Sequence, residues 1–167
     1  MIVIREASGA VEVEWVRALM RDYAAYLAGG PAGICIEGFE AELASLPGAY
    51  SSPSGTLLVA LRDGTPVGCC AIKPIRVQSA APDERSCEMK RLWVAPEARG
   101  LGLGRRLVDR AVEWARAAGY TALYLDTAPA AMPEANRLYG AMGFVEIDRF
   151  NDNPVPGIVF FRLQLGR

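Results

Sequence analysis

Residues 99–105 read Arg99-Gly100-Leu101-Gly102-Leu103-Gly104-Arg105, and they are the most informative part of the chain. They lie between a strand-like run at 87–94 and a long amphipathic helix that is predicted to begin near Leu101. Glycine lacks the side chain that would keep a ligand away from the backbone. The first N–H groups of a helix have no partner within the helix and carry partial positive charge. We therefore predict that this turn holds a phosphate or pyrophosphate, and that Arg99 and Arg105 supply full charges.

Hydrophobic periodicity and turn residues predict further elements on both sides of this turn. The dipeptide Asp63-Gly64, for example, is typical of a hairpin between two strands. We expect strands at 2–5, 57–62, 66–73, 87–94, 121–126, 144–147 and 157–165, and helices at 8–29, 37–45, 101–118 and 133–142. Because strands and helices alternate around one sheet, the predicted fold class is α/β (α+β) with a mixed sheet.

Length and composition are those of one soluble domain, which we expect to span residues 1–167. The net charge is −1, so general binding to nucleic acid or to a membrane surface is not expected. The N-terminus lacks the order of a signal peptide, and no apolar run reaches the ~20 residues of a membrane span. The chain has four cysteines without C-x-x-C spacing and no histidine, which argues against a metal site. We expect a reduced, cytoplasmic protein.

Two other kinds of phosphate-binding turn share some features with this one. The pattern Gly100-x-Gly102-x-x-Arg105 lacks the third glycine of a dinucleotide-binding turn, and the turn begins late, six residues after Val94. Asp126, at the end of the next strand, is near the acidic position that such a site requires and favours this alternative. A P-loop is excluded because no Lys-Ser/Thr follows the glycines.

The pattern Arg99-x-x-Gly102-x-Gly104 resembles the central motif of the GNAT superfamily of acyl-CoA-dependent N-acetyltransferases. The similarity extends over Leu92–Leu107, and Leu138-Tyr139-Gly140-Ala141-Met142-Gly143-Phe144 is similar to the family's downstream motif. It covers roughly residues 57–165, while the N-terminal helices fit more loosely. The resemblance implies a twisted, mixed and mostly antiparallel central sheet of about seven strands flanked by helices.

The resemblance also implies where acetyl-CoA binds. The pyrophosphate is expected on the backbone amides of the turn, and the pantetheine arm is expected along the preceding strand like an added strand. The coenzyme-binding residues expected on this basis are Leu92, Trp93, Val94, Arg99, Gly100, Leu101, Gly102, Leu103, Gly104, Arg105 and Asn136. The backbone N–H of Val94 is expected to donate to the acyl carbonyl oxygen.

Two side chains are candidates for the chemistry of acyl transfer. Some family members have a glutamate general base at the position of Glu88, and burial would raise its pKa toward neutrality. Glu88 could instead form an ion pair with Lys90 or Arg91. The resemblance gives Tyr139 the role of a general acid that protonates the departing thiolate. The alternative for Tyr139 is a packing aromatic.

One position departs from the family pattern. Many members have a coenzyme-binding asparagine seven residues before the motif tyrosine, where this chain has Met132. Asn136 is the nearest substitute, although an ordinary solvated polar residue is an equal interpretation.

The acceptor is expected to be a small amine-bearing molecule or peptide, bound between the N-terminal helices and the loop at 149–157. The candidate residues there are Arg21, Asp22, Tyr23, Tyr26, Glu37 and Asp126. A non-catalytic acyl-CoA sensor and a small dinucleotide-binding oxidoreductase are the alternative functions. The oligomeric state is left open, a homodimer included.

Overall fold

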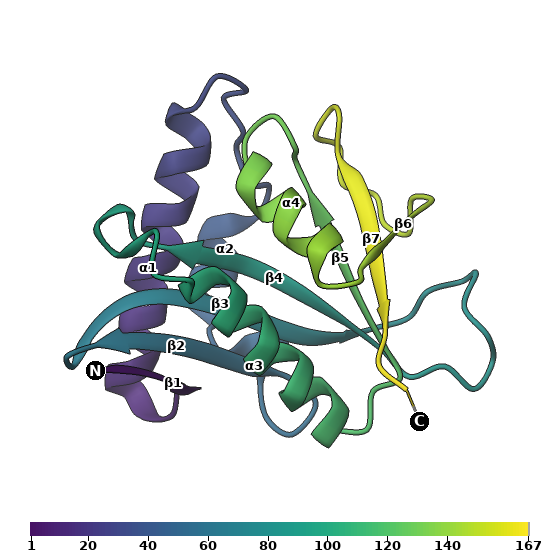
Figure 1. The fold of residues 1–167 in the computed structure, drawn as a ribbon, viewed down its shortest axis with the longest axis horizontal. Helices are drawn as coiled ribbons and strands as arrows, with labels where there is room; N and C mark the ends of the chain where they lie inside the picture. The colour runs from purple at the N-terminus through teal and green to yellow at the C-terminus, as the bar shows by residue number, and fades with distance from the viewer. Residues whose placement is uncertain (167) are drawn as a thin grey trace.

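The computed structural model describes residues 1–166, which form one seven-stranded sheet with helices on both faces (Figure 1). The strands are β1 (Ile2–Glu6), β2 (Thr56–Arg62), β3 (Thr65–Ile75), β4 (Ser86–Val94), β5 (Ala122–Thr127), β6 (Val145–Ile147) and β7 (Val159–Gln164). The helices are α1 (Gly9–Gly29), α2 (Phe39–Ser45), α3 (Leu103–Ala117) and α4 (Pro133–Ala141), with short 3₁₀ turns at Gly48–Tyr50 and Pro96–Ala98.

The strand order is β1-β2-β3-β4-β5-β7-β6. All neighbouring strands are antiparallel except β4 and β5, which are parallel and joined through α3. The predicted fold class, a mixed and mostly antiparallel sheet of about seven strands flanked by helices, is confirmed.

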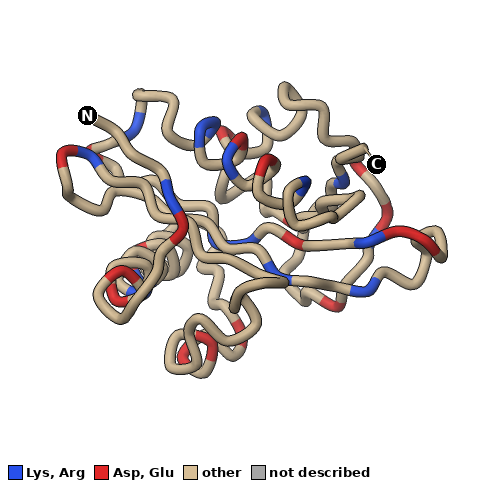
Figure 2. Tube along the Cα trace, turned by 90° about the horizontal axis from the view of Figure 1, so that it is seen from below, with Lys and Arg blue, Asp and Glu red and all other residues tan. Residues whose placement is uncertain are grey.

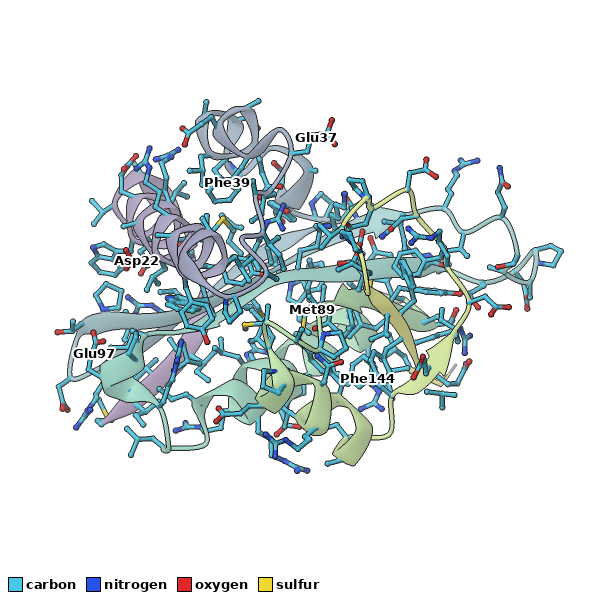
Figure 3. The ribbon with its side chains drawn as sticks, turned by 90° about the horizontal axis from the view of Figure 1, so that it is seen from above. Asp22, Glu37, Phe39, Met89, Glu97 and Phe144 are labelled. Atoms are coloured by element: carbon cyan, nitrogen blue, oxygen red, sulfur yellow. The ribbon has the colours of Figure 1, made fainter. Side chains whose placement is uncertain are left out.

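Each face of the sheet has its own hydrophobic core. Helices α1 and α2 cover one face, where Val16, Met20 and Leu43 pack against Val59 and Trp93. Helices α3 and α4 cover the other face. Figure 3 shows the two layers from above, with Phe39 on the α1 and α2 side and Phe144 on the α4 side. Alternation along each strand therefore decides which layer a side chain faces.

Three predicted boundaries were wrong by two residues for the same reason. Helix α2 begins at Phe39 rather than at Glu37, because its N-cap Gly38 has a left-handed φ of 69°. Helix α3 begins at Leu103 rather than near Leu101, because its N-cap Gly102 has a left-handed φ of 70°. Strand β7 begins at Val159 rather than at Gly157, whose φ is 75°. A residue with positive φ interrupts helix and strand geometry alike.

Strand β4 is bulged in its middle. Cys69 is opposite Trp93 and Ala71 is opposite Lys90, so β4 has two residues between these pairs where β3 has one. Arg91 lies in this bulge with a φ of 60°. A bulge of this kind bends and twists its strand.

Strands β4 and β5 pair over a short segment and then separate. Their parallel register joins Ser86–Glu88 with Ala122–Tyr124. Beyond these residues the two strands diverge toward the N-terminus of α3 and the loop before α4 (Figure 1). The divergence opens the middle of the sheet at the carboxyl ends of two parallel strands, which is where ligands bind in open α/β sheets.

An ion pair fastens the bulge to α2. The Arg91 guanidinium donates from Nε and Nη2 to the two carboxylate oxygens of Glu42, each at 2.8 Å. The side chains are 11% and 23% exposed. Burial is the largest single influence on the pKa of Glu42 and acts to raise it, but the hydrogen bonds and charge of Arg91, together with Lys90 and Tyr50, outweigh burial, and the pKa is lowered.

Replacing Glu42 should therefore destabilise the protein. The change Glu42→Ala leaves the Arg91 charge largely buried without its carboxylate, and we expect a loss of about 2 kcal/mol, below the usual range for a fully buried pair. This corresponds to a melting temperature lower by about 4–8 °C at pH 7. Because the folded-state pKa of Glu42 is lowered, the difference should disappear as the pH falls through that pKa. Glu40→Ala, on the exposed side of the same helix, is the control; an equal effect of both changes would contradict this role of the ion pair.

Candidate functional site

Two cavities meet where β4 and β5 separate. The first, here called the glycine-turn cavity, has a volume of about 460 Å³ and lies between the turn, the end of β4 and the start of α4. The second, here called the inter-strand cavity, has a volume of about 320 Å³ and reaches from the gap toward α1 and the loop at 151–158. Leu92, Met132 and Ala135 line both cavities, so a ligand in one can reach the other at these residues.

The glycine turn is open toward its cavity. Gly100 and Gly102 have φ angles of 79° and 70°, which non-glycine residues rarely adopt. A Cβ atom at either position would find no other atom within 4 Å. Backbone amides here can be approached closely, and the N–H groups of the first turn of α3 add the positive end of a helix dipole. These features fit an anion such as pyrophosphate.

Arg99 is held beside the turn by three contacts. Its Nε donates to the carbonyl oxygen of Val94 at 3.1 Å. Its guanidinium lies 4.9 Å from the ring centroid of Trp93 and 5.1 Å from that of Tyr26. Cation–π contacts on two rings fix the orientation of the charge. Arg99 therefore presents a positioned cation to the cavity that it lines.

The edge of β4 near the gap carries backbone groups directed away from β3. The N–H of Ala95 donates to the carbonyl oxygen of Val67 at 2.8 Å, toward the β3 side. Because successive N–H groups alternate in direction along a strand, that of Val94 is directed to the other side, where β5 has diverged. This is the geometry needed for pairing with an extended ligand arm.

Glu88 lies at the gap and is buried. Its carboxylate oxygens lie 3.4 Å from the Lys90 ammonium and 3.9 Å from that of Lys73. Burial raises the pKa of Glu88, while the two lysines act in the opposite direction. The ion pair with Lys90, which sequence analysis offered as the alternative to a general-base role, is present in the structure, whereas Arg91 is bound to Glu42.

Tyr139 approaches the same gap from the opposite layer. It belongs to the α3 and α4 core, where its ring lies 5.6 Å from Phe144 and 6.1 Å from Phe161 between centroids. It also lines the inter-strand cavity together with Glu88. Burial raises the pKa of its phenol, which therefore stays protonated at neutral pH. Tyr139 is thus a packing residue and a cavity residue at once.

Three of the expected coenzyme residues are engaged elsewhere or turned to solvent. The Nδ2 of Asn136 donates to Thr127 Oγ1 and to the Met132 carbonyl oxygen, each at 3.0 Å, and so fastens α4 to the end of β5. Arg105 lies 3.9 Å from Asp109 on the exposed side of α3. Leu101 is an exposed apolar residue. Their contribution to coenzyme binding stays a prediction.

Two features of the site were missed by sequence reasoning. Lys73 is directly opposite Glu88 in the β3–β4 register, a relation that depends on the bulge. The Oδ2 of Asp126 accepts hydrogen bonds from the side-chain amides of Asn151 at 2.7 Å and Asn153 at 3.3 Å. A polar triplet in a turn-rich loop, Asn151-Asp152-Asn153, was the available signal for the second feature.

Within residues 1–166, no helix combines the length and apolar character needed to cross a membrane. The same residues contain no cluster of three or more cysteine, aspartate or glutamate side chains able to hold a metal ion.

Comparison with known proteins gives consistent matches. The sequence model of the Acetyltransferase (GNAT) family matches residues 16–144, which includes most of α1, the part that fitted more loosely on sequence motifs. An uncharacterized N-acetyltransferase of Schizosaccharomyces pombe is 39% identical over 127 residues, or 75% of this chain and 74% of the relative.

Two solved structures share the fold. An acetyltransferase from Streptococcus agalactiae superposes with a TM-score of 0.77 at 22% identity, covering 98% of each chain. An acetyltransferase from Salmonella typhimurium, solved with its cofactor acetyl-CoA, superposes with a TM-score of 0.70 at 20% identity, covering 99% of this chain and 94% of the other.

A side chain at Gly104 should obstruct the glycine-turn cavity without disturbing the fold. A Cβ there would meet Leu138 at an ordinary 3.7 Å, so the two γ-methyl groups of Gly104→Val must extend along the cavity wall. We expect affinity for acetyl-CoA, measured by calorimetry, to fall about tenfold or more, which is ~1.4 kcal/mol. The melting temperature should hardly change, because valine is no worse than glycine in a helix.

Gly140→Val in α4 is the matched control, since a Cβ there meets no atom within 4 Å and the position lies outside both cavities. Unchanged affinity of the Gly104 variant would contradict ligand binding at this turn.

Proposed function

The chain belongs to the GNAT acetyltransferase family, and from this premise we propose that it transfers the acetyl group of acetyl-CoA to a primary amine of a small molecule or peptide. The observation that carries the proposal is the meeting of two cavities at the gap between β4 and β5. One cavity suits a coenzyme and the other suits an acceptor. The relative from Salmonella typhimurium, solved with acetyl-CoA, supports the choice of coenzyme.

The coenzyme would lie with its pyrophosphate on the amides of Gly100–Gly104 and its charge facing Arg99. Its pantetheine arm would pair with the β4 edge at Leu92–Val94, which brings the thioester to the residues shared by both cavities. There the N–H of Val94 is directed toward the gap and would stabilise the oxygen of the tetrahedral intermediate. Met132, Ala135 and Leu92 give this point an apolar wall.

Glu88 is proposed as the general base. The amine nitrogen attacks the thioester carbonyl carbon, a C–N bond forms, and Glu88 accepts the proton that the nitrogen loses. Burial supports this role, because a raised pKa makes the carboxylate a better proton acceptor near neutral pH. The two lysines keep the carboxylate ionised enough to act.

Tyr139 is proposed as the general acid. When the C–S bond breaks, the sulfur takes the electron pair and would receive a proton from the phenol. A buried phenol is a weak acid, but a thiolate at the same depth is a correspondingly strong base.

Asp126 gives no support to the dinucleotide alternative. It lines the inter-strand cavity and binds two asparagines, whereas the glycine turn lines the other cavity. A sensor without turnover would bind acetyl-CoA but release no thiol when an amine is supplied. A cytoplasmic location stays a prediction.

Removing the base should lower turnover in a pH-dependent way. With Glu88→Gln, we expect the rate of thiol release from acetyl-CoA with an amine panel to fall about 10²-fold or more. The loss should be largest above the raised pKa of Glu88, where the wild-type carboxylate is ionised, and smaller below it, where that group is protonated. The loss of rate should also become smaller near the pKa of the acceptor amine, because much of the amine is then unprotonated without the help of a base. Acetyl-CoA affinity should stay unchanged; an unaltered pH–rate profile would assign the base role to another group.

Removing the acid should affect kcat more than KM. Tyr139→Phe keeps the ring against Phe144 and Phe161 and removes the hydroxyl, so we expect kcat to fall about 10²-fold with little change in KM. Tyr23→Phe is the matched control, because Tyr23 lines the same cavity from α1. A larger loss for the Tyr23 variant, or a parallel loss of activity and melting temperature for Tyr139→Phe, would contradict the assignment.

A further inference from the structure

The inter-strand cavity contains a row of three charged side chains on one face of the sheet. Lys73 is the direct partner of Glu88 across the β3–β4 pair, and Lys90 is two residues beyond Glu88 on the same strand. Lys73 shares the strand face of Cys69 and Ala71, which pack in the α1 and α2 core. All three side chains therefore point to the face of the sheet that α1 and α2 cover. Figure 2 shows basic and acidic stretches following one another along these central strands.

These two lysines are the only lysines in the sequence; every other basic residue is an arginine. An ammonium group is a compact charge with three donors, whereas the guanidinium is a planar fork that suits fixed bidentate pairs. Arg91, the third cation lining the cavity, has such a pair with Glu42. The lysines instead contact Glu88 at the longer distances of 3.4 and 3.9 Å.

The charges in this row do not balance. Two ammonium groups face one carboxylate, which leaves a surplus of one positive charge. Their side chains are 31% and 18% exposed, so water screens this surplus incompletely. A partly desolvated surplus charge favours a ligand of opposite sign.

A pole of the opposite sign lies on β5. The Oδ2 of Asp126 accepts hydrogen bonds from the neutral side-chain amides of Asn151 and Asn153. These amides orient the carboxylate but do not cancel its charge. Glu37, the remaining acidic residue lining the cavity, is exposed at its mouth. The cavity thus presents a positive pole at Lys73 and Lys90 and a negative pole at Asp126.

We propose that the acceptor is a small amino acid, whose carboxylate binds Lys73 and Lys90 and whose amine lies between Glu88 and Asp126. This inference rests on the proposed function and names the substrate class of the same site. A cavity of about 320 Å³ suits a molecule of this size. The ammonium form is drawn to Asp126 and releases one proton to water, which leaves a neutral amine with a lone pair for the attack. Glu88 then accepts the second proton, which the nitrogen loses as the C–N bond forms. Both lysines act in binding and positioning.

The first test compares acceptors that differ in the carboxylate alone. L-Alanine, L-leucine and L-phenylalanine are each assayed against their amides and their decarboxylated amines, by thiol release from acetyl-CoA between pH 7 and 9.5. Rates over this pH range allow kcat/KM to be expressed per unprotonated amine, so that acceptors with different amine pKa values can be compared. We expect at least one amino acid to exceed both counterparts at least tenfold in kcat/KM. Equal or better use of the neutral counterparts would overturn the proposal while leaving acetyl transfer itself intact.

The second test uses variants. Lys73→Met and Lys90→Met should each lower kcat/KM for the best amino acid at least tenfold more than for its amide, because loss of a lysine changes the ionisation of Glu88 for both acceptors but removes the carboxylate contact for the amino acid alone. Lys73→Arg and Lys90→Arg should restore part of the preference. Arg76→Met, an exposed charge just beyond β3, is the control and should change neither. An unchanged ratio of amino acid to amide in both methionine variants would contradict the proposal.

A third measurement needs no variant and no turnover. Wild-type protein labelled with ¹³C and ¹⁵N in lysine gives two ammonium groups to observe by NMR. Both should shift on titration with the amino acid and CoA, and neither should shift with the amide. Shifts without thiol release from any amine would refute the proposed transfer but keep the binding site; turnover without lysine shifts would refute the site alone.

Discussion

The parallel pairing of β4 with β5 stops at Glu88 and Tyr124, and the rest of the site depends on that limit. Backbone N–H and C=O groups in a folded protein need partners, and beyond this point β5 no longer supplies them on one side of β4. The bulge at Arg91 bends β4 away, and the ion pair with Glu42 holds the bulge in place. An opening in the middle of a sheet joins the two layers, which otherwise have separate cores.

That opening lets groups from opposite layers act on one reacting centre. Glu88 faces the α1 and α2 layer, while Tyr139 belongs to the α3 and α4 layer, and both line the same cavity. Burial raises the pKa of each group, which makes the carboxylate a stronger base and keeps the phenol protonated. Burial thus favours proton acceptance by Glu88 and keeps on Tyr139 the proton that it donates. Lys73 and Lys90 limit the rise in the pKa of Glu88 and also give the inter-strand cavity its positive pole.

Local sequence predicted the parts of the site that depend on local geometry. The glycines of the turn, the helix that follows and the strand before it were recognisable because φ preference, helix ends and alternation act within a few residues. The pairing of Glu88 with Lys90 was also visible, since the two residues are on one strand face. Lys73 was missed because its position opposite Glu88 depends on a register that the bulge shifts. Asn136 stays a prediction for the coenzyme, and its contacts with Thr127 and the Met132 carbonyl oxygen could not be predicted, because they depend on how α4 packs at the end of β5.

Hydrogen exchange of single backbone amides, followed by NMR with and without saturating acetyl-CoA, tests the central claim most directly. Pairing of the coenzyme with the open edge of β4 predicts that exchange at Val94 and at Gly104 slows at least tenfold on binding. Ala95, which already donates to Val67, should change far less. Slowing elsewhere in the chain, with Val94 and Gly104 exchanging as before, would contradict the account.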